Sequence, residues 1–565
     1  MAEHREENGY SAEGTEVGFG ENRLVAPLTV PIFRRIWVSS LLSNFAPLII
    51  GVAAAWQMTK LSTNPTMVAL VQTAIMSPFM VFSLFAGALA DIADRRKVSI
   101  FALVFPVIGA IGLAVLSHLH LATPALLLIL CFIVGMGLAL FSPAWQSSVS
   151  EQVSPKMLSA AIALNGISFN IARSIGPAIG GVLVAAVGVV ATFGATVVLY
   201  LPLFVALLCW RREQEVSRLP PEKLRAAIMA GVRFAYHSPR LMRILARGFT
   251  AAFALASLYA LMPLIARDIL GGGPQLYGLL LAGFGVGSVI GALIVSRMQA
   301  RFEPEVIIRS CMVIIAVVIV SASVSDRAWF TVVMLGFAGM GWMIVATLLN
   351  VLVQTGAPRW VTARALGMFQ TTVAGGLALG SWTWGEIASQ TNLQTSLICS
   401  ASAMAVFLLL SLARPLTRDD GQPSTPAEMR PDPEITLAIT GRSGPITLEI
   451  EYRIEPARAR EFYRLMEELG RMKRRNGAQS WMLARDLHDP AIWLERYQHA
   501  TWDDFRRNRN RETEAERQLQ VQIVEMTMDG KIKARRLLDR PAGSVRWNDD
   551  VPDYGANEVH STTIA

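Results

Sequence analysis

The chain has 565 residues, of which 53% are hydrophobic and 17% are charged, and its mean hydropathy is +0.42. This balance excludes a soluble globule of ordinary composition and favours a protein that crosses a membrane. The net charge of +8 indicates no nucleic-acid partner, because the excess of Lys and Arg lies in loops between apolar runs, where membrane topology explains it. The four cysteines lie far apart and form no CxxC pair, so we expect no disulfide, metal site or cofactor.

Residues 1–33 are polar and acidic and contain no signal-peptide core, so we expect the first apolar run to direct membrane insertion. Twelve apolar runs are long enough to cross about 30 Å of hydrocarbon as helices. The predicted spans are 36–58, 66–90, 98–117, 123–145, 157–184, 188–210, 244–266, 275–297, 305–324, 328–353, 363–387 and 393–413. A polar loop at 211–243 divides them into bundles of six, at 34–210 and 244–413. The pattern therefore predicts an all-α membrane protein of two six-helix bundles.

Basic residues are concentrated in alternate loops between the predicted spans. One set of loops holds Arg34, Arg35, Arg95, Arg96, Lys97, Lys156, Arg297, Arg301, Arg359 and the basic residues of 211–243, whereas the other holds Lys60, Arg267 and Arg327. By the positive-inside rule, both chain ends are cytoplasmic in a multi-pass protein of the plasma (inner) membrane. A similar six-residue segment precedes the fifth and eleventh spans, at 155–160 and 358–363, which favours two related halves.

Beyond the last span the hydropathy falls sharply. A linker at 414–445, rich in Pro, Asp and Thr, leads to residues 446–540, where alternating and helical patterns follow the order βαββαβ. This order predicts a small cytoplasmic α+β domain of the ferredoxin-like type. Residues 541–565 form a polar tail.

The segment between the second and third spans, residues 87–97, carries a pattern of glycine, aspartate and paired arginines. It resembles the signature loop of the major facilitator superfamily, G-x-L-A-D-R-x-G-R-R/K, through Gly87, Leu89, Asp91, Arg95 and Arg96. Ile92 and Asp94 depart from that pattern. Gly87 permits close helix contact, and Asp91 is suited to accept hydrogen bonds from a neighbouring helix N-terminus. The resemblance implies a gate on the cytoplasmic side; alternatively, the basic residues only anchor the loop.

The fifth span contains a glycine-proline pattern from Arg173 to Gly181. It resembles the G-P-x-x-G-G element of exporters in the same superfamily, through Gly176, Pro177, Gly180 and Gly181. The glycines permit close backbone approach and the proline bends the helix, which the resemblance links to outward release; tight packing alone is the alternative. Arg173 is a strong base well inside a span, so we expect it to meet either an anionic substrate group or a backbone carbonyl.

Other polar side chains within the spans are candidates for lining a central path, and each is also suited to bond a neighbouring helix. They are Asn44, Gln57, Gln72, Gln146, Asn170 and Gln370. No Asp or Glu lies at mid-membrane depth in this assignment, and Glu386 is the nearest candidate for coupling to protons. We expect His118 and His120, in an outer loop, to be solvated rather than to bind a metal.

Segments spread over residues 30–413 resemble the transmembrane secretion effector group of this superfamily, which includes the enterobactin exporter. They are 33–35, 52–59, 65–73, 143–146 and 170–173. The resemblance implies a secondary transporter, not an enzyme, that exports small amphiphiles such as drugs or siderophore-like metabolites by alternating access. Residues 44–47 depart from the group's Gly-containing turn, so the resemblance does not extend to the substrate contacts of the first span.

The C-terminal region resembles the dimeric α+β barrel of antibiotic-biosynthesis monooxygenases through residues 476–478, Trp481, Glu495 and Trp502. This resemblance implies a homodimer formed through that domain. No nucleophile, base and orienting group stand together, so an interaction or regulatory role is favoured. Two alternatives stay open: a membrane-anchored enzyme with Trp481 and His488 in its pocket, and a substrate-free sensor on a transporter scaffold.

Overall fold

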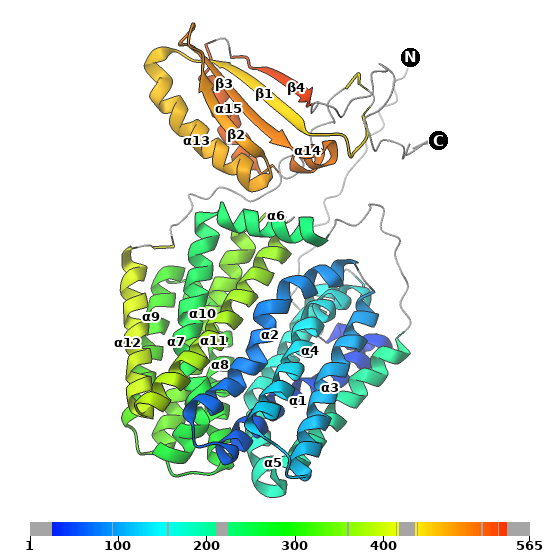
Figure 1. The fold of residues 1–565 in the computed structure, drawn as a ribbon, viewed down its shortest axis with the longest axis vertical. Helices are drawn as coiled ribbons and strands as arrows, with labels where there is room; N and C mark the ends of the chain where they lie inside the picture. Colours follow the sequence, from blue (N-terminus) through cyan, green and yellow to red (C-terminus); the bar gives the residue numbers. More distant parts are fainter. Residues whose placement is uncertain are drawn as a thin grey trace, which may run out of the picture.

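A computed structural model describes most of the chain. The described residues are 25–92, 94–154, 157–210, 224–358, 361–413, 415–416, 435–437, 439–509, 512–528 and 530–539. They form a bundle of long apolar helices with a small α+β domain at one end (Figure 1).

The N-terminal half of the bundle follows the predicted spans closely. Its helices are α1 (Pro31–Leu61), α2 (Pro65–Ile92), α3 (Arg95–His118), α4 (Pro124–Ser148) and α5 (Leu158–Cys209). At 52 residues, α5 would be about 78 Å long if it were straight, far more than a membrane requires. The chain turns at Gly188, whose φ of 79° suits a residue without a β-carbon. The two arms of α5 therefore match the predicted spans 157–184 and 188–210.

The C-terminal half contains the remaining long helices. They are α7 (Pro239–Leu264, continued by the π-helix Ile265–Ile269), α8 (Pro274–Gln299), α9 (Pro304–Val324), α10 (Ala328–Gly356), α11 (Thr362–Gln390) and α12 (Leu393–Ala413). Ten helices of the described residues, with α5 counted once, are long and apolar enough to cross a membrane. The 29-residue α11 is not among these ten, although it packs within the bundle.

One helix contradicts the prediction of a polar loop at 211–243. Within that stretch lies α6 (Leu224–Tyr236), and α7 already begins at Pro239 rather than near residue 244. At 13 residues, α6 is too short for a span, and charged neighbours mask its apolar residues in the sequence. Phe234 and Ala235 nevertheless belong to the buried core of the bundle.

The two halves meet mainly along two pairs of helices. Within each half, α1 packs on α5, α2 and α3 pack on α4, α7 packs on α11, α8 packs on α10, and α9 packs on α12. Between the halves, α2 packs on α11 and α5 packs on α8. Any movement of one half against the other must therefore change these two interfaces.

The C-terminal domain contains β1 (Ile446–Arg453), α13 (Ala459–Asn476), β2 (Gln479–Arg485), β3 (Ile492–His499), α14 (Trp502–Arg509), α15 (Glu514–Glu525) and β4 (Lys533–Leu538). Two helices, where one was predicted, lie between β3 and β4. The antiparallel strands have the order β2-β3-β1-β4. Buried aromatic residues, among them Tyr452, Phe462 and Trp493, pack between the sheet and the helices α13 and α15.

Candidate functional site

The interface between α5 and α8 is built from close backbone contacts. A β-carbon on Gly181 would lie only 2.7 Å from the Pro274 carbonyl oxygen and 2.8 Å from Gly278 Cα. Further along, the Ser174 hydroxyl donates a 3.2 Å hydrogen bond to the Gly285 carbonyl. The absence of a side chain at Gly181 therefore lets the two halves touch.

The other glycines of the exporter-like pattern face a different neighbour. A β-carbon on Gly176 would lie 3.3 Å from the Leu48 side chain, and one on Gly180 would lie 3.2 Å from Val52. Both contacts are with α1, inside the same half. The pattern thus serves two contacts at once, with α1 behind it and α8 across the interface, and close packing accounts for each glycine.

Arg173 reaches across the interface between the halves. Its guanidinium donates a 3.2 Å hydrogen bond to the hydroxyl of Tyr259 on α7. A tyrosine hydroxyl was not among the partners considered from the sequence. Tyr259 stands out in the sequence as a polar aromatic residue in an otherwise apolar span, but only the fold shows that it lies beside Arg173.

The interface between α2 and α11 uses hydroxyl groups. Thr66 donates to Glu386 Oε2 at 3.0 Å and to the Gly385 carbonyl at 3.3 Å, and Thr73 donates to the Ala378 carbonyl at 2.9 Å. Glu386 also accepts from Gln390 Nε2 at 2.8 Å. The carboxylate suggested for proton coupling therefore lies at the boundary between the halves.

The contacts of Thr66, Thr73 and Gly181 with the opposite half lie toward one end of the bundle, whereas Arg173 and Ser174 lie near the middle of the first arm of α5. Two more occur at that same end: Arg267 Nη1 donates to the Thr59 carbonyl at 2.8 Å, and the rings of Trp56 and Tyr277 stack with centroids 6.5 Å apart. We call the contacts of Thr59, Thr66, Thr73, Trp56 and Gly181 with the opposite half the distal seam. Since α2 begins and α11 ends there, the distal seam lies away from the C-terminal domain (Figure 1).

The signature-like segment lies at the opposite end of the bundle. Arg95 bonds Glu151 Oε1 at 2.9 Å and the Ser147 carbonyl at 2.8 Å, while Arg96 bonds the carbonyls of Leu207 and Leu208 at 2.7 and 2.6 Å. The two arginines thus tie together the ends of α3, α4 and α5, which is more than a solvated anchor does.

Two signature positions, Gly87 and Asp91, lie on α2, but their side chains fall outside the described part of the chain. Leu89 packs against Val98 and Ala144. Asp94, which departs from the signature, accepts from the backbone N–H of Arg96 and Lys97 and so caps α3. An aspartate just before a helix is a recognisable N-cap signal, so this role could have been found from the sequence.

A comparable arginine arrangement in the second half was missed from the sequence. Arg247, only 6% exposed, and Arg309 both bond Glu305, at 3.0 and 2.7 Å, and both donate to the Ser411 carbonyl near the end of α12. In each half, arginines thus satisfy carbonyls at the end of the last helix. Glu305 and Arg309 stand four residues apart, a spacing that could have indicated the pair.

The remaining polar candidates take several roles. Asn44 donates to the Ser168 hydroxyl at 3.0 Å and so links α1 to α5. Gln146, which bonds Ser142 at 3.2 Å, and Gln370 are exposed. Gln57, Gln72 and Asn170 are half-buried. Asn44 is thus an interhelical contact, and the exposed glutamines on α4 and α11 are the strongest candidates to meet a solute.

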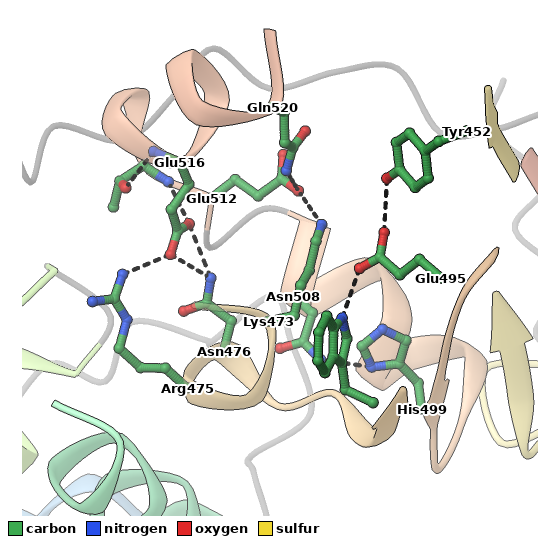
Figure 2. Close-up of polar contacts among 12 residues, drawn as sticks. Tyr452, Lys473, Arg475, Asn476, Glu495, His499, Asn508, Glu512, Glu516 and Gln520 are labelled. Atoms are coloured by element: carbon green, nitrogen blue, oxygen red, sulfur yellow. Dashed lines mark hydrogen bonds and ion pairs between the residues drawn. The ribbon is translucent and has the colours of Figure 1, made fainter. Parts of the chain in front are cut away.

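The C-terminal domain buries a hydrogen-bonded polar network (Figure 2). Glu495 is 0% exposed and accepts from the Tyr452 hydroxyl and from Trp481 Nε1, both at 2.8 Å. Burial, together with the Glu495 charge, raises the pKa of Tyr452. A cavity of about 260 Å³ beside this group is lined by Tyr452, Lys473 and Glu495, whereas His488 is exposed in the β2–β3 turn. Trp481 and His488 are therefore not brought together as a pocket.

A family model described as transmembrane secretion effector matches residues 23–541. The chain belongs to the transmembrane secretion effector family. The chain is 26% identical over 402 residues to the enterobactin exporter EntS of Salmonella typhimurium, covering 68% of this chain and 92% of that protein. It is 22% identical over 379 residues to the multidrug efflux pump Tap of Mycolicibacterium fortuitum, covering 65% and 92%.

The solved structures that resemble this family member are membrane transporters. A bacterial homologue of the human lysosomal transporter Spinster, inward-facing and unoccupied, matches with a TM-score of 0.55 and 14% identity, over 69% of this chain and 96% of that chain. The nucleoside transporter NupG matches with a TM-score of 0.54 and 12% identity, over 68% and 98%. The relatives and the fold are those of multi-pass transporters, which confirms the predicted class of protein.

Proposed function

We propose that the chain is a secondary active exporter of small amphiphilic molecules, such as drugs or siderophore-like metabolites. The observation that carries the proposal is the distal seam, where two helix bundles meet near one end through close backbone contacts and single hydrogen bonds. Transporters that work by alternating access close one end of a central path while the other end is open. The names of the relatives EntS and Tap support export of a siderophore or drug as the direction and substrate class.

Counting the arms of α5 separately and including α11 with the apolar helices supports twelve spans in two bundles of six. The positive-inside rule then favours a cytoplasmic position for both chain ends and for the C-terminal domain. In that orientation the distal seam faces the outside. In this proposal the conformation is closed to the outside, and the exposed Gln146 and Gln370, on the cytoplasmic halves of α4 and α11, are candidates to meet a solute from the cytoplasm.

Asp91 and Arg173 have separate roles in this proposal. Asp91 gates the cytoplasmic end, and Asp91→Asn should lower turnover more than expression. Arg173 links the halves through Tyr259, a contact that opening toward the outside must break. Arg173→Ala should abolish export if the guanidinium also meets substrate, whereas Tyr259→Phe, which removes only the hydroxyl, should leave most of it.

The test is accumulation of a fluorescent amphiphilic dye and of a siderophore in cells with the chain, without it, and with Arg173→Ala at equal membrane abundance. Lower accumulation with the intact chain than in both other cells is the expected result. Equal accumulation of every compound in all three would overturn the exporter assignment.

The C-terminal domain has a second proposed role as a dimer contact. Its strand order and antiparallel pairing support a ferredoxin-like fold. The sheet face opposite α13 and α15 presents a ladder of opposite charges between β1 and β4, Glu451 with Lys533 at 3.0 Å and Glu449 with Arg535 at 3.9 Å, and the exposed Met482 lies on β2, beyond β3. A second copy related by two-fold symmetry would meet the same face. A monomer mass in detergent at all concentrations would rule this dimer out.

A further inference from the structure

Helix α6 touches both halves of the transporter. It lies across the ends of α2, α7 and α11, beneath α13 of the C-terminal domain (Figure 1). Phe234 is 1% exposed and belongs to the core of the bundle, and a β-carbon on Gly231 would lie 3.1 Å from Arg364 Cβ on α11. Because α2 and α11 belong to different halves, rocking of one half against the other must disturb at least one of these contacts.

The C-terminal domain packs on the other side of α6. The Arg475 guanidinium lies 5.6 Å from the centre of the Phe234 ring, a cation–π distance. A β-carbon on Gly477 would lie 2.7 Å from Arg233 Nη2, so Arg233 is in close contact with the residue that caps the C-terminal end of α13. Burial lowers the pKa of Arg233, and the nearby Asp504 carboxylate on α14 opposes that effect. We call Arg233, Phe234, Arg475, Gly477 and Asp504 the docking surface.

On the side of the C-terminal domain, hydrogen bonds join Arg475 of the docking surface and its neighbour Asn476 to Glu516 (Figure 2). Arg475 bonds Glu516 Oε1 at 2.7 Å, and Asn476 bonds both oxygens of the same carboxylate at 2.9 Å. Glu516 also closes a capping box with Thr513 at the start of α15. These hydrogen bonds join the end of α13 to the start of α15, so α6 packs against a surface that is connected to the rest of the domain.

The segment that follows α12 and leads toward the C-terminal domain makes a second set of contacts with the bundle. Arg243, at the start of α7, donates to the Pro415 carbonyl at 2.8 Å, and the Leu416 backbone N–H donates to Glu305 on α9 at 3.1 Å. These contacts attach the chain after α12 to the C-terminal half only. The docking surface on α6 is thus the path by which the domain can also influence α2 of the N-terminal half.

We propose that the C-terminal domain is a brake on alternating access, acting through α6. While docked, it holds α6 against α2 and α11 and so favours the arrangement in which the distal seam is closed. Opening the seam requires the cytoplasmic ends of α2 and α11 to move relative to each other. While the C-terminal domain holds α6, this helix cannot keep its contacts with both. The inference rests on the proposed function for its physiological meaning, whereas the conformational bias itself is measurable without any substrate.

The test measures how often the distal seam opens. Ala69 is 0% exposed and faces Gly385 across the seam, so Ala69→Cys reports opening to a membrane-impermeant maleimide added outside. The exposed Cys209 and Cys399 are first replaced by Ser in the full-length chain. We expect Arg233→Ala combined with Arg475→Gln to raise the labelling rate about three- to tenfold, as loss of a partly desolvated cation–π contact suggests.

The matched control is Arg471→Gln, on the exposed face of α13 one turn before Arg475, which should leave the rate unchanged. Asp504→Asn provides a milder second variant, which should raise the rate by a smaller factor if the double variant is unstable. An unchanged rate in both test variants, with monodisperse protein, overturns the brake. Dye efflux by the same variants distinguishes the regulatory role of the C-terminal domain from the exporter function. Export without a change in labelling rate contradicts only the regulatory role. A change in labelling rate without any export contradicts only the exporter function.

Discussion

The interface between the two halves and the C-terminal domain bury polar groups in different ways. Between the halves, Thr73 and Ser174 each make a single hydroxyl-to-carbonyl bond, and each such bond contributes about 1 kcal/mol net. In the C-terminal domain, by contrast, the buried carboxylates Glu495 and Glu516 each accept from several donors. The first kind of contact can be broken and remade, whereas the second holds one geometry. The bundle is therefore suited to switching and the domain to rigid support.

The substitution Glu516→Ala tests most strongly whether the buried network stabilises the C-terminal domain. Removal of the carboxylate leaves the buried Asn476 and the partly buried Arg475 with unpaired donors, and losing one partner of a buried pair costs about 3–5 kcal/mol. We expect hydrogen exchange of α13 and α15 in the full-length protein to accelerate by more than a hundredfold. Glu467→Ala on the exposed face of α13 is the control. Exchange no faster than in that control would mean that the network does not stabilise the domain.

A pH change tests the same domain through His499. Burial, and then the charges of Lys473 and Arg233, lower the pKa of this imidazole to about 4 from 6.5, and its ring bonds Asn508 at 2.8 Å. Between these two values the unfolded chain binds a proton that the folded domain does not, so stability must fall as pH falls from 6.5 to 4. The shift corresponds to about 3 kcal/mol. Thermal unfolding against pH should show this slope, and His499→Gln should flatten it.

The bundle offers a paired test of the glycine contacts. Gly181→Ala places a β-carbon against α8 of the other half, whereas Gly180→Ala places one against α1 of the same half. Overpacking costs about 1–3 kcal/mol, and only at Gly181 is it relieved by opening the seam. We expect Gly181→Ala to raise Ala69→Cys labelling about tenfold and Gly180→Ala to raise it little. Equal effects of the two substitutions would show that α5 does not divide its contacts in this way.

The smallest expected effect belongs to Thr73→Val, which removes the hydroxyl donated to the Ala378 carbonyl while keeping the shape of the side chain. Loss of one such bond is worth about 1 kcal/mol, so labelling at Ala69→Cys should rise about fivefold. Thr355→Val, on α10 with a bond inside its own helix, is the comparison. A rise as large as that for Gly181→Ala would mean that hydrogen bonds rather than packing hold the seam.

Much of the bundle could be predicted from the sequence, because the length of an apolar run is a local property that the thickness of a membrane constrains. The predicted span 393–413 coincides with α12, and the predicted span 328–353 differs from α10 only at its end. Charge placement likewise indicated the loops, and the glycine and proline patterns located the close contacts of α5.

Only the tertiary structure decided which surfaces meet. Arg96 bonds the carbonyls of Leu207 and Leu208, more than a hundred residues away, and Gly181 faces α8 while Gly180 faces α1, although the two are adjacent in the chain. The role of α6 was hidden because a short helix carries too little apolar periodicity to stand out. A local sequence pattern indicates which face of a segment contacts solvent or lipid. Which two segments pack together depends on contacts between residues far apart in the chain, and no local pattern shows those contacts.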